Sequence, residues 1–223
     1  MIIQARSQKV LIDHILSRGE GIYISLSITS YHSLKIFRKT QRDKNEYYFL
    51  DGQGAVFCEN IRVGSFVYKK LPGCEAWLRL IEELDSQNIA IIGATEKVNN
   101  KTKLILEQKY KNIKVPVSIH GYQNLDPDDI VTQLKKYNVK YVFLGLGQPD
   151  QEWLSRELLQ KHPAVYMPLG GSFDVLSGSS SRAPRLYQIL MLEWLYRIFT
   201  KRNKAQNFAS LFKGIFNAFN LHF

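Results

Sequence analysis

The residues of this 223-residue chain whose types could do chemistry lie in glycine-containing segments that follow short apolar runs. Backbone N–H groups and side chains in such loops can bind a phosphate, and a carboxylate there can act as a general base if it is suitably oriented. Neither the phosphate-loop signature nor the dinucleotide-binding fingerprint is present, which disfavours a standard NTPase or dehydrogenase. The segments are Asp51-Gly52-Gln53-Gly54, Gly93, Gly145-Leu146-Gly147-Gln148-Pro149 and Gly170-Gly171-Ser172-Phe173-Asp174.

Taken one at a time, the candidate side chains also have ordinary structural explanations. Asp51-Gly52 is typical of a turn after a strand. Glu152 falls in the first turn of a predicted helix, where the helix dipole alone favours a carboxylate. Asp174 has the alternative role of a helix N-cap. The order and spacing of the segments therefore carry more information than any single residue.

The elements that must position these residues alternate between strand and helix patterns, which predicts an α/β fold with a Rossmann-like, mostly parallel sheet flanked by helices. Because the carboxyl ends of such strands share an edge, the glycine segments should converge on one rim. The predicted strands are Ile22–Thr29, Tyr47–Leu50, Ile89–Ala94, Val115–His120, Tyr141–Leu146 and Val165–Leu169. The predicted helices are His32–Arg42, Cys74–Gln87, Asn99–Tyr110, Asp128–Asn138 and Asp150–Lys161.

The C-terminal segment differs from the rest of the chain in charge and aromatic content. The net charge is +10, and residues 182–223 hold seven basic side chains against one acidic one, together with nine of the 27 aromatic residues. From about Ala205, large apolar residues recur at helical spacing. We expect a domain of residues 1–180 and a C-terminal basic amphipathic helical appendage of residues 181–223, which suits a lipid headgroup interface or, equally, docking on the protein's own core.

Composition excludes some classes of protein and leaves others open. Cys58 and Cys74 are the only cysteines and lack partners at zinc-ligand spacing, so we expect no metal site. We see no signal-peptide pattern and no uncharged run long enough to span a bilayer, which predicts a cytoplasmic protein. The positive charge favours anionic partners, and a nucleic-acid-binding protein is an alternative, although the tail aromatics follow one helical face rather than a groove.

Several motifs become specific when they are taken together and in order. They are Asp51-Gly52-Gln53-Gly54, Gly145-Leu146-Gly147-Gln148-Pro149-Asp150-Gln151-Glu152, Gly170-Gly171-Ser172-Phe173-Asp174, Gly178 with Arg182-Ala183-Pro184, and Leu192-Glu193-Trp194-Leu195-Tyr196-Arg197. In this arrangement the chain, from about Thr29 to Arg197, resembles the WecG/TagA/CpsF family of bacterial glycosyltransferases, also called glycosyltransferase family 26.

The resemblance implies a Rossmann-like enzyme that transfers a sugar, often an N-acetylhexosamine or its uronic acid, from a UDP-sugar donor to a polyprenyl-diphosphate-linked acceptor. Its products would feed cell-surface polysaccharides such as capsule and exopolysaccharide. The family is regarded as inverting and metal-independent, so no cofactor is expected. Its C-terminal segment is associated with recruitment to the membrane surface, which would place the protein peripherally on the inner face of the cell membrane.

The motifs also imply roles for particular residues. Asp51 is expected to be the general base that deprotonates the acceptor hydroxyl, with Thr29 as a second catalytic residue. Without a metal, the departing UDP diphosphate needs guanidinium groups or helix N-termini. The expected substrate-binding residues are Gln151, Asp174, Gly145, Gly147, Gly171, Arg182, Arg185 and Arg197.

The sequence departs from the family pattern upstream of these motifs. Thr29-Ser30-Tyr31 stands where the family usually has Thr-x-Asn, so the Asn of the donor site is missing. This departure leaves the donor sugar open, with an N-acetylhexosamine favoured, and it keeps a non-catalytic scaffold of the same family as an alternative. The three arginines have an alternative as solvated or lipid-facing charges. The oligomeric state stays open, a homo-oligomer included.

Overall fold

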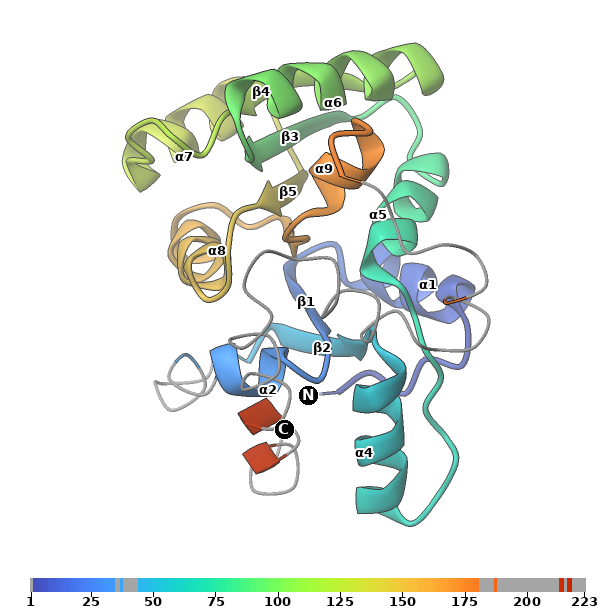
Figure 1. Cartoon of the computed structure of the whole chain (residues 1–223). Helices are drawn as coiled ribbons and strands as arrows, with labels where there is room; N and C mark the ends of the chain where they lie inside the picture. Colours follow the sequence, from blue (N-terminus) through green and yellow to red (C-terminus); the bar gives the residue numbers. More distant parts are fainter. Residues whose placement is uncertain are drawn as a thin grey trace.

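A computed structural model describes residues 2–34, 37, 44–180, 187, 213–214 and 216–217. At its centre, six strands form one sheet in which every described pair runs parallel (Figure 1). The order across the sheet is β2-β1-β6-β5-β3-β4. The strands are β1 (Gly21–Leu26), β2 (Glu46–Leu50), β3 (Asn88–Gly93), β4 (Lys114–Ile119), β5 (Tyr141–Gly145) and β6 (Val165–Pro168). All six predicted strands are confirmed, and the sheet is wholly parallel where a mostly parallel one was predicted.

Helices cover both faces of the sheet, which confirms the predicted α/β architecture (Figure 1). One face carries α2 (Ser30–Ser33), α4 (Gln53–Val63), α7 (Pro127–Lys136) and α8 (Asp150–Lys161). The other face carries α1 (Gln8–Arg18), α5 (Gly73–Glu82), α6 (Glu96–Lys109) and α9 (Ser172–Leu176).

The strands are buried on both faces, as parallel strands between two helix layers must be. In β1, Ile22 and Ile24 contribute to the core beneath α7 and α8, whereas Tyr23 points into the core beneath α1 and α5. All residues of β2 and β6 are buried. These two cores fix the helices on the sheet and thereby fix the loops that join them.

Three of the described helices, α1, α4 and α9, were not predicted. The reason is clearest for α4, which begins at Gln53 and carries Gly54 as its second residue. Glycine lowers helix propensity. A Cβ at Gly54 would lie only 3.3 Å from the Cβ of Ile28, so the close packing of α4 on the loop after β1 favours glycine there. Tertiary packing thus overrides the local preference.

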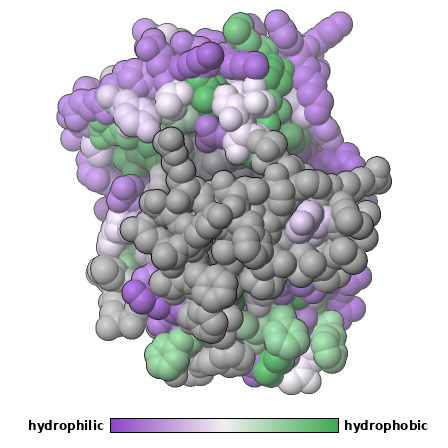
Figure 2. Space-filling model, viewed as in Figure 1, coloured by the Kyte–Doolittle hydropathy of each residue, from purple (hydrophilic) through white to green (hydrophobic). Residues whose placement is uncertain are grey.

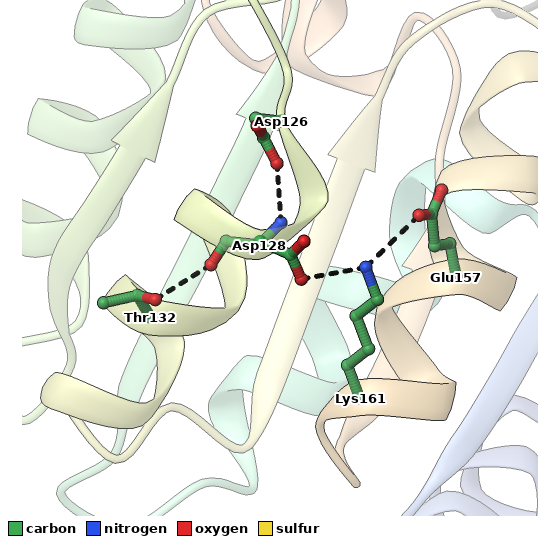
Figure 3. A network of polar contacts seen from close by, with 5 residues as sticks. All are labelled: Asp126, Asp128, Thr132, Glu157 and Lys161. Atoms are coloured by element: carbon green, nitrogen blue, oxygen red, sulfur yellow. Dashed lines mark hydrogen bonds and ion pairs between the residues drawn. The ribbon is translucent and has the colours of Figure 1, made fainter.

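A polar network joins α7 to α8 at the end of α8 that lies away from the glycine segments (Figure 3). Lys161 donates to the Asp128 carboxylate at 2.9 Å and to that of Glu157 at 3.4 Å. Asp126 caps α7 by accepting from the Asp128 N–H at 2.9 Å, and the Thr132 hydroxyl donates to the Asp128 carbonyl. The network orients α8 relative to its neighbour.

A buried ion pair ties the middle of α8 to β2, at the far side of β1. The Arg156 guanidinium contacts Glu46 Oε1 at 2.6 Å, and it lies over the ring of Phe37 at 3.8 Å from the ring centroid. Glu46 also accepts from the Tyr48 hydroxyl. A buried pair is stable only when both charges keep their partners. This one anchors α8 across two strands and leaves its first turn facing the rim.

Most of the predicted appendage lies outside the described residues, as does most of the predicted helix His32–Arg42 beyond α2. Within the tail, Lys213, Gly214, Phe216 and Asn217 are described as helical. Asn217 is buried and its amide lies 3.3 Å from His32 Nδ1, so this part of the tail contacts α2. Among the helices built from described residues, none combines the length and the hydrophobicity that crossing a bilayer requires.

Candidate active site

Four neighbouring strands, β2, β1, β6 and β5, bring most of the glycine segments to one edge of the sheet. After β1 the chain turns to the face that carries α2, whereas after β6 it turns to the opposite face, which carries α9. Where adjacent loops diverge in this way, open parallel sheets usually bind their ligands. The predicted rim is therefore formed, and β1 and β6 are at its centre.

Asp51 stands at the end of β2 beside the β1 loop. Its backbone N–H donates to the Leu26 carbonyl at 2.9 Å, which continues the pairing of β1 with β2. A Cβ on Gly52 would lie 3.6 Å from the Cα of Ser27, and a Cβ on Gly73 would lie 3.4 Å from Asp51 Oδ2. The half-buried carboxylate thus lies between the β1 loop and the first turn of α5. Asp51-Gly52 leads directly into a helix and not into an isolated turn.

Three hydroxyl groups gather in the loop after β1. Thr29 Oγ1 lies 3.0 Å from Ser27 Oγ, and Ser27 Oγ lies 2.9 Å from Ser30 Oγ. The Ser27 N–H also donates to Ser30 Oγ at 3.1 Å. Thr29 is exposed and Ser30 is buried, so the cluster runs from the surface into the protein.

The hydroxyl cluster continues into the first turn of α8 and from there to the β6 loop. Ser30 Oγ donates to Gln148 Oε1 at 3.1 Å, and Gln148 Nε2 donates to Glu152 Oε1 at 3.0 Å. Gln151 Nε2 donates to the same Glu152 oxygen at 3.0 Å. Gln151 Oε1 in turn accepts from the Gly170 N–H at 2.9 Å. One hydrogen-bonded chain therefore joins Thr29 to Gln151 and Gly170.

Within this series of hydrogen-bonded side chains, Glu152 is the most deeply buried, with an exposed fraction of 0 %. Burial raises the pKa of its carboxyl to about 7, although the hydrogen bonds from Gln151 and Gln148 act in the opposite direction. The helix dipole would lower the pKa, so desolvation outweighs it here. Among the described residues, no donor or acceptor contacts Glu152 Oε2. Glu152 does lie in the first turn of α8, but it is no surface carboxylate.

The predicted glycines occupy different environments on the rim. Gly145 is buried, and a Cβ there would collide with the Phe173 ring, so its small size serves packing. Gly147 is exposed with open space around it, and Gly171 is exposed as the N-cap of α9. The N-cap of α9 is therefore Gly171 and not Asp174, for which capping was the alternative explanation. Asp174 lies in the first turn of α9, half-buried, with its Oδ2 3.8 Å from the position of a Cβ on Gly171.

The cationic part of the predicted site is not described. Arg182, Arg185 and Arg197 lie outside the described residues, so their contacts with a diphosphate stay predictions. Within the part of the chain that the structure describes, no group of three or more His, Cys, Asp or Glu side chains is arranged to hold a metal ion. Cys58 is buried and Cys74 is half-buried, and the two are not joined by a disulfide bond.

A sequence profile of the glycosyl transferase WecG/TagA/CpsF family matches residues 9–218, which is nearly the whole chain. The chain belongs to this family.

Relatives in Staphylococcus aureus share part of the sequence. The N-acetylglucosaminyldiphosphoundecaprenol N-acetyl-beta-D-mannosaminyltransferase of strain NCTC 8325 / PS 47 is 32% identical over 154 residues, which cover 68% of this chain and 60% of the relative. The protein of the same name from strain MRSA252 is 31% identical over the same length. The chain thus spans about 60% of the length of these curated relatives.

The departure from the WecG/TagA/CpsF pattern at position 31 has a structural explanation. Where the family usually has Asn, Tyr31 is fully buried, and its hydroxyl donates to Glu59 Oε1 of α4 at 2.7 Å. Glu59 is also paired with Arg62. The side chain at this position therefore binds α2 to α4 within the core and does not face the rim.

No role was predicted for four polar members of the rim, namely Ser27, Ser30, Gln148 and Glu152. Ser27 and Ser30 follow a strand, as site residues in this fold often do, but short hydroxyl side chains are common in loops. Gln148 and Glu152 flank the motif residue Gln151 and were assigned no role of their own. Gln148 and Glu152 are recognised as members of the rim by their burial and by their hydrogen bonds, which only the tertiary structure shows.

Proposed function

We propose that this chain is a UDP-sugar-dependent, inverting glycosyltransferase that acts on a polyprenyl-diphosphate-linked acceptor in the synthesis of a cell-surface polysaccharide. Family membership carries the proposal, and the position of Asp51 beside the β1 loop supports it. The Staphylococcus aureus relatives are named for transfer of N-acetylmannosamine to an undecaprenyl-diphosphate-linked N-acetylglucosamine. An N-acetylhexosamine is accordingly the donor sugar we favour.

In the proposed reaction, Asp51 accepts the proton of the acceptor hydroxyl while that oxygen bonds to the anomeric carbon. The bond from this carbon to the UDP oxygen breaks, and its electron pair leaves with UDP. A single displacement of this kind inverts the anomeric centre. Thr29 is the second catalytic residue of the proposal, and Gln151 and Asp174 contribute to the donor site, together with the exposed Gly147 and Gly171. Arg182, Arg185 and Arg197 balance the charge of the departing diphosphate.

The proposed architecture is a Rossmann-like catalytic domain of residues 1–180 with a membrane-associating helical appendage of residues 181–223. The contact of Asn217 with His32 supports a tail that reaches the rim. The protein would work on the cytoplasmic side of the cell membrane, where it meets both a soluble UDP-sugar and a lipid-linked acceptor. Neither a cofactor nor a nucleic acid takes part in this proposal.

An apolar surface on α4 supports association with membrane lipids. Phe57 and Ile61 are exposed on α4, and Phe66 just beyond its end is 91 % exposed. Figure 2 shows apolar side chains gathered at the lower end of the molecule, where Figure 1 places α4. Lys69 follows nearby, whereas the single acidic residue of α4, Glu59, is buried. An apolar surface with basic neighbours suits an anionic lipid headgroup layer.

The test of catalysis is UDP release by the wild type and by Asp51→Asn, with a panel of UDP-hexoses and UDP-N-acetylhexosamines. Each donor is measured with and without a polyprenyl-diphosphate-linked sugar in detergent. We expect release that depends on the acceptor and falls roughly 10²- to 10⁴-fold in the variant, as for a positioned acid–base group. Unchanged turnover in Asp51→Asn would remove Asp51 from this role. No release with any donor, combined with donor binding in calorimetry, would favour the scaffold alternative.

The test of membrane association is sedimentation with anionic phosphatidylglycerol vesicles and with neutral phosphatidylcholine vesicles. We expect the double variant Phe57→Ser, Phe66→Ser to bind the anionic vesicles more weakly than the wild type. Leu104→Ser, Tyr122→Ser is the matched control, because it removes two exposed apolar side chains at a distance from α4. Equal loss in both variants would argue against a specific surface. Sedimentation with an oligonucleotide instead of lipid would favour the nucleic-acid alternative.

A further inference from the structure

The chain of hydrogen bonds between Thr29 and Gly170 has a fixed direction. The Gly170 N–H can only donate, so Gln151 must present its oxygen to it and turn its Nε2 toward Glu152. Glu152 Oε1 accepts from this group and from Gln148 Nε2. Gln148 is thereby left with its oxygen toward Ser30, which donates to it. Glu152 accepts a hydrogen bond from each of the two glutamine amides and so sets their orientations.

The same direction extends through the hydroxyl groups. Each hydroxyl has one proton, and that of Ser30 is used on Gln148. Ser27 must therefore donate to Ser30, and Thr29 must donate to Ser27. With its proton turned inward, the exposed Thr29 oxygen presents lone pairs to the outside. It can accept a hydrogen bond from a ligand hydroxyl or N–H group.

Stability alone does not explain this arrangement. Glu152, Gln151 and Ser30 are all buried, and no described residue forms a hydrogen bond with Glu152 Oε2. A buried polar atom without a partner destabilises the folded state, and apolar side chains of similar volume usually do as well or better in a core. A carboxyl group at this position is explained if its other oxygen, Oε1, holds the side-chain amides of Gln148 and Gln151 in one orientation.

We propose that Glu152 and Gln148 are positioning residues, which act through Gln151, Ser30 and Thr29 to hold the β1 loop and the β6 loop in one binding arrangement. The inference rests on the proposed function in one respect, since it takes this rim as the donor site. Neither residue has to touch the substrate. Their contribution is to fix which atoms of Thr29 and Gln151 are donors and which are acceptors.

The kinetic test compares Glu152→Ala, Glu152→Gln and Gln148→Ala with the wild type. We expect kcat/KM for the UDP-sugar to fall roughly 10- to 100-fold in both alanine variants, as misplacement of binding groups does. The loss should appear mainly in KM for the donor, with KM for the acceptor unchanged. Glu152→Gln retains an oxygen that can accept from both amides, so it should stay within about threefold of the wild type.

Asn60→Ala is the matched control, because Asn60 is also a buried polar side chain with fixed hydrogen bonds, but these join it to the backbone of Tyr68 and not to the rim. It should lower the free energy of unfolding and leave KM for the donor unchanged. A wild-type donor KM in Glu152→Ala would overturn the proposal, as would a Glu152→Gln variant as impaired as Glu152→Ala. If Glu152→Ala does not fold, Gln148→Ala and Glu152→Gln still decide, because Gln148 is only half-buried.

A readout without turnover separates this inference from the proposed function. The side-chain amide resonances of Gln148 and Gln151, assigned with Gln→Leu variants, should show slow exchange with solvent in the wild type and in Glu152→Gln. Exchange should become fast in Glu152→Ala. This result together with no transfer from any donor would refute the function and keep the positioning network. Fast exchange in the wild type would refute the network, whatever the activity.

Discussion

At the scale of single residues, the environment of a side chain decides its chemistry more than its type does. Asp51 and Glu152 are both carboxylates near the rim, but Asp51 is half-buried beside the β1 loop and Glu152 is enclosed with two amides. In our proposals, the first accepts a proton from the substrate and the second holds its neighbours in place. Burial raises the pKa of Glu152, so its environment can be tested by varying the pH.

Stability should decrease with rising pH because of Glu152. Burial raises its pKa from 4.5 to about 7, with Asp150 adding to the rise and the amides of Gln151 and Gln148 opposing it. A raised carboxyl pKa means that the folded state binds the proton more tightly than the unfolded state. The stabilisation is therefore complete below about pH 4.5 and is lost as the pH approaches 7. The shift corresponds to about 3 kcal/mol.

This is measured by urea unfolding of the wild type and Glu152→Gln from pH 4.5 to 8. The difference between their free energies of unfolding should change in favour of the variant as the pH rises, and become constant above about pH 8. A difference that does not vary with pH would show that Glu152 titrates normally in the folded protein.

At the scale of elements, close approaches between loops and helices determine where the rim lies. The chain from β5 to α9 is an example, because Phe173 of α9 packs directly on Gly145 at the end of β5. Phe173 also contacts Trp77 of α5, with ring centroids 5.6 Å apart. The strand end, the β6 loop and α5 are therefore held by one set of contacts beneath the rim.

Replacing Gly145 by Ala should destabilise the protein, because the new methyl group would overlap the Phe173 ring. Overpacking of this kind lowers the free energy of unfolding by about 1 to 3 kcal/mol. Gly147→Ala is the control, since nothing lies within 4 Å of a Cβ at that position. Its effect should stay below about 0.5 kcal/mol. Chemical denaturation measures the free energy of unfolding of both variants. Equal effects would show that overlap with the Phe173 ring does not destabilise Gly145→Ala.

At the scale of the whole molecule, positive charge and exposed apolar groups bear on the proposed partner. The net charge is +10, and the exposed side chains of α4 and Phe216 are apolar. A lipid-linked acceptor is presented only at a membrane surface. An enzyme with the proposed activity would therefore gain from any contact that holds its rim close to that surface, whether it comes from α4 or from the tail.

Neutralising Lys201, Arg202 and Lys204 by substitution with Gln should weaken binding to phosphatidylglycerol vesicles, since each basic residue near an anionic surface contributes about 1 kcal/mol. The effect should diminish as salt is added, because salt screens charges at a surface. The control removes the same charge from exposed lysines on and after α6, with Lys97, Lys101 and Lys111 changed to Gln. Equal weakening in both would attribute the binding to net charge rather than to the tail.

The sequence by itself determined where the six strands lie along the chain, a mostly parallel sheet, and the membership of Asp51, Gln151 and Asp174 in a family motif. These follow from local patterns, since burial on both faces makes a strand continuously apolar and strand ends collect glycine. Helix α4 could not be predicted in this way, because Gly54 is favoured by its close packing on Ile28 and not by helix propensity.

Only the tertiary structure decided which polar side chains form one unit. Ser30 and Gln148 are separated by 118 positions along the chain, and Gln151 and Gly170 by 19. Their contacts exist because β1, β6 and β5 are neighbours in the sheet. Strand order depends on how the two helix layers pack and not on any local pattern. Likewise, the burial that raises the pKa of Glu152 depends on many distant residues, so no short stretch of sequence could reveal it.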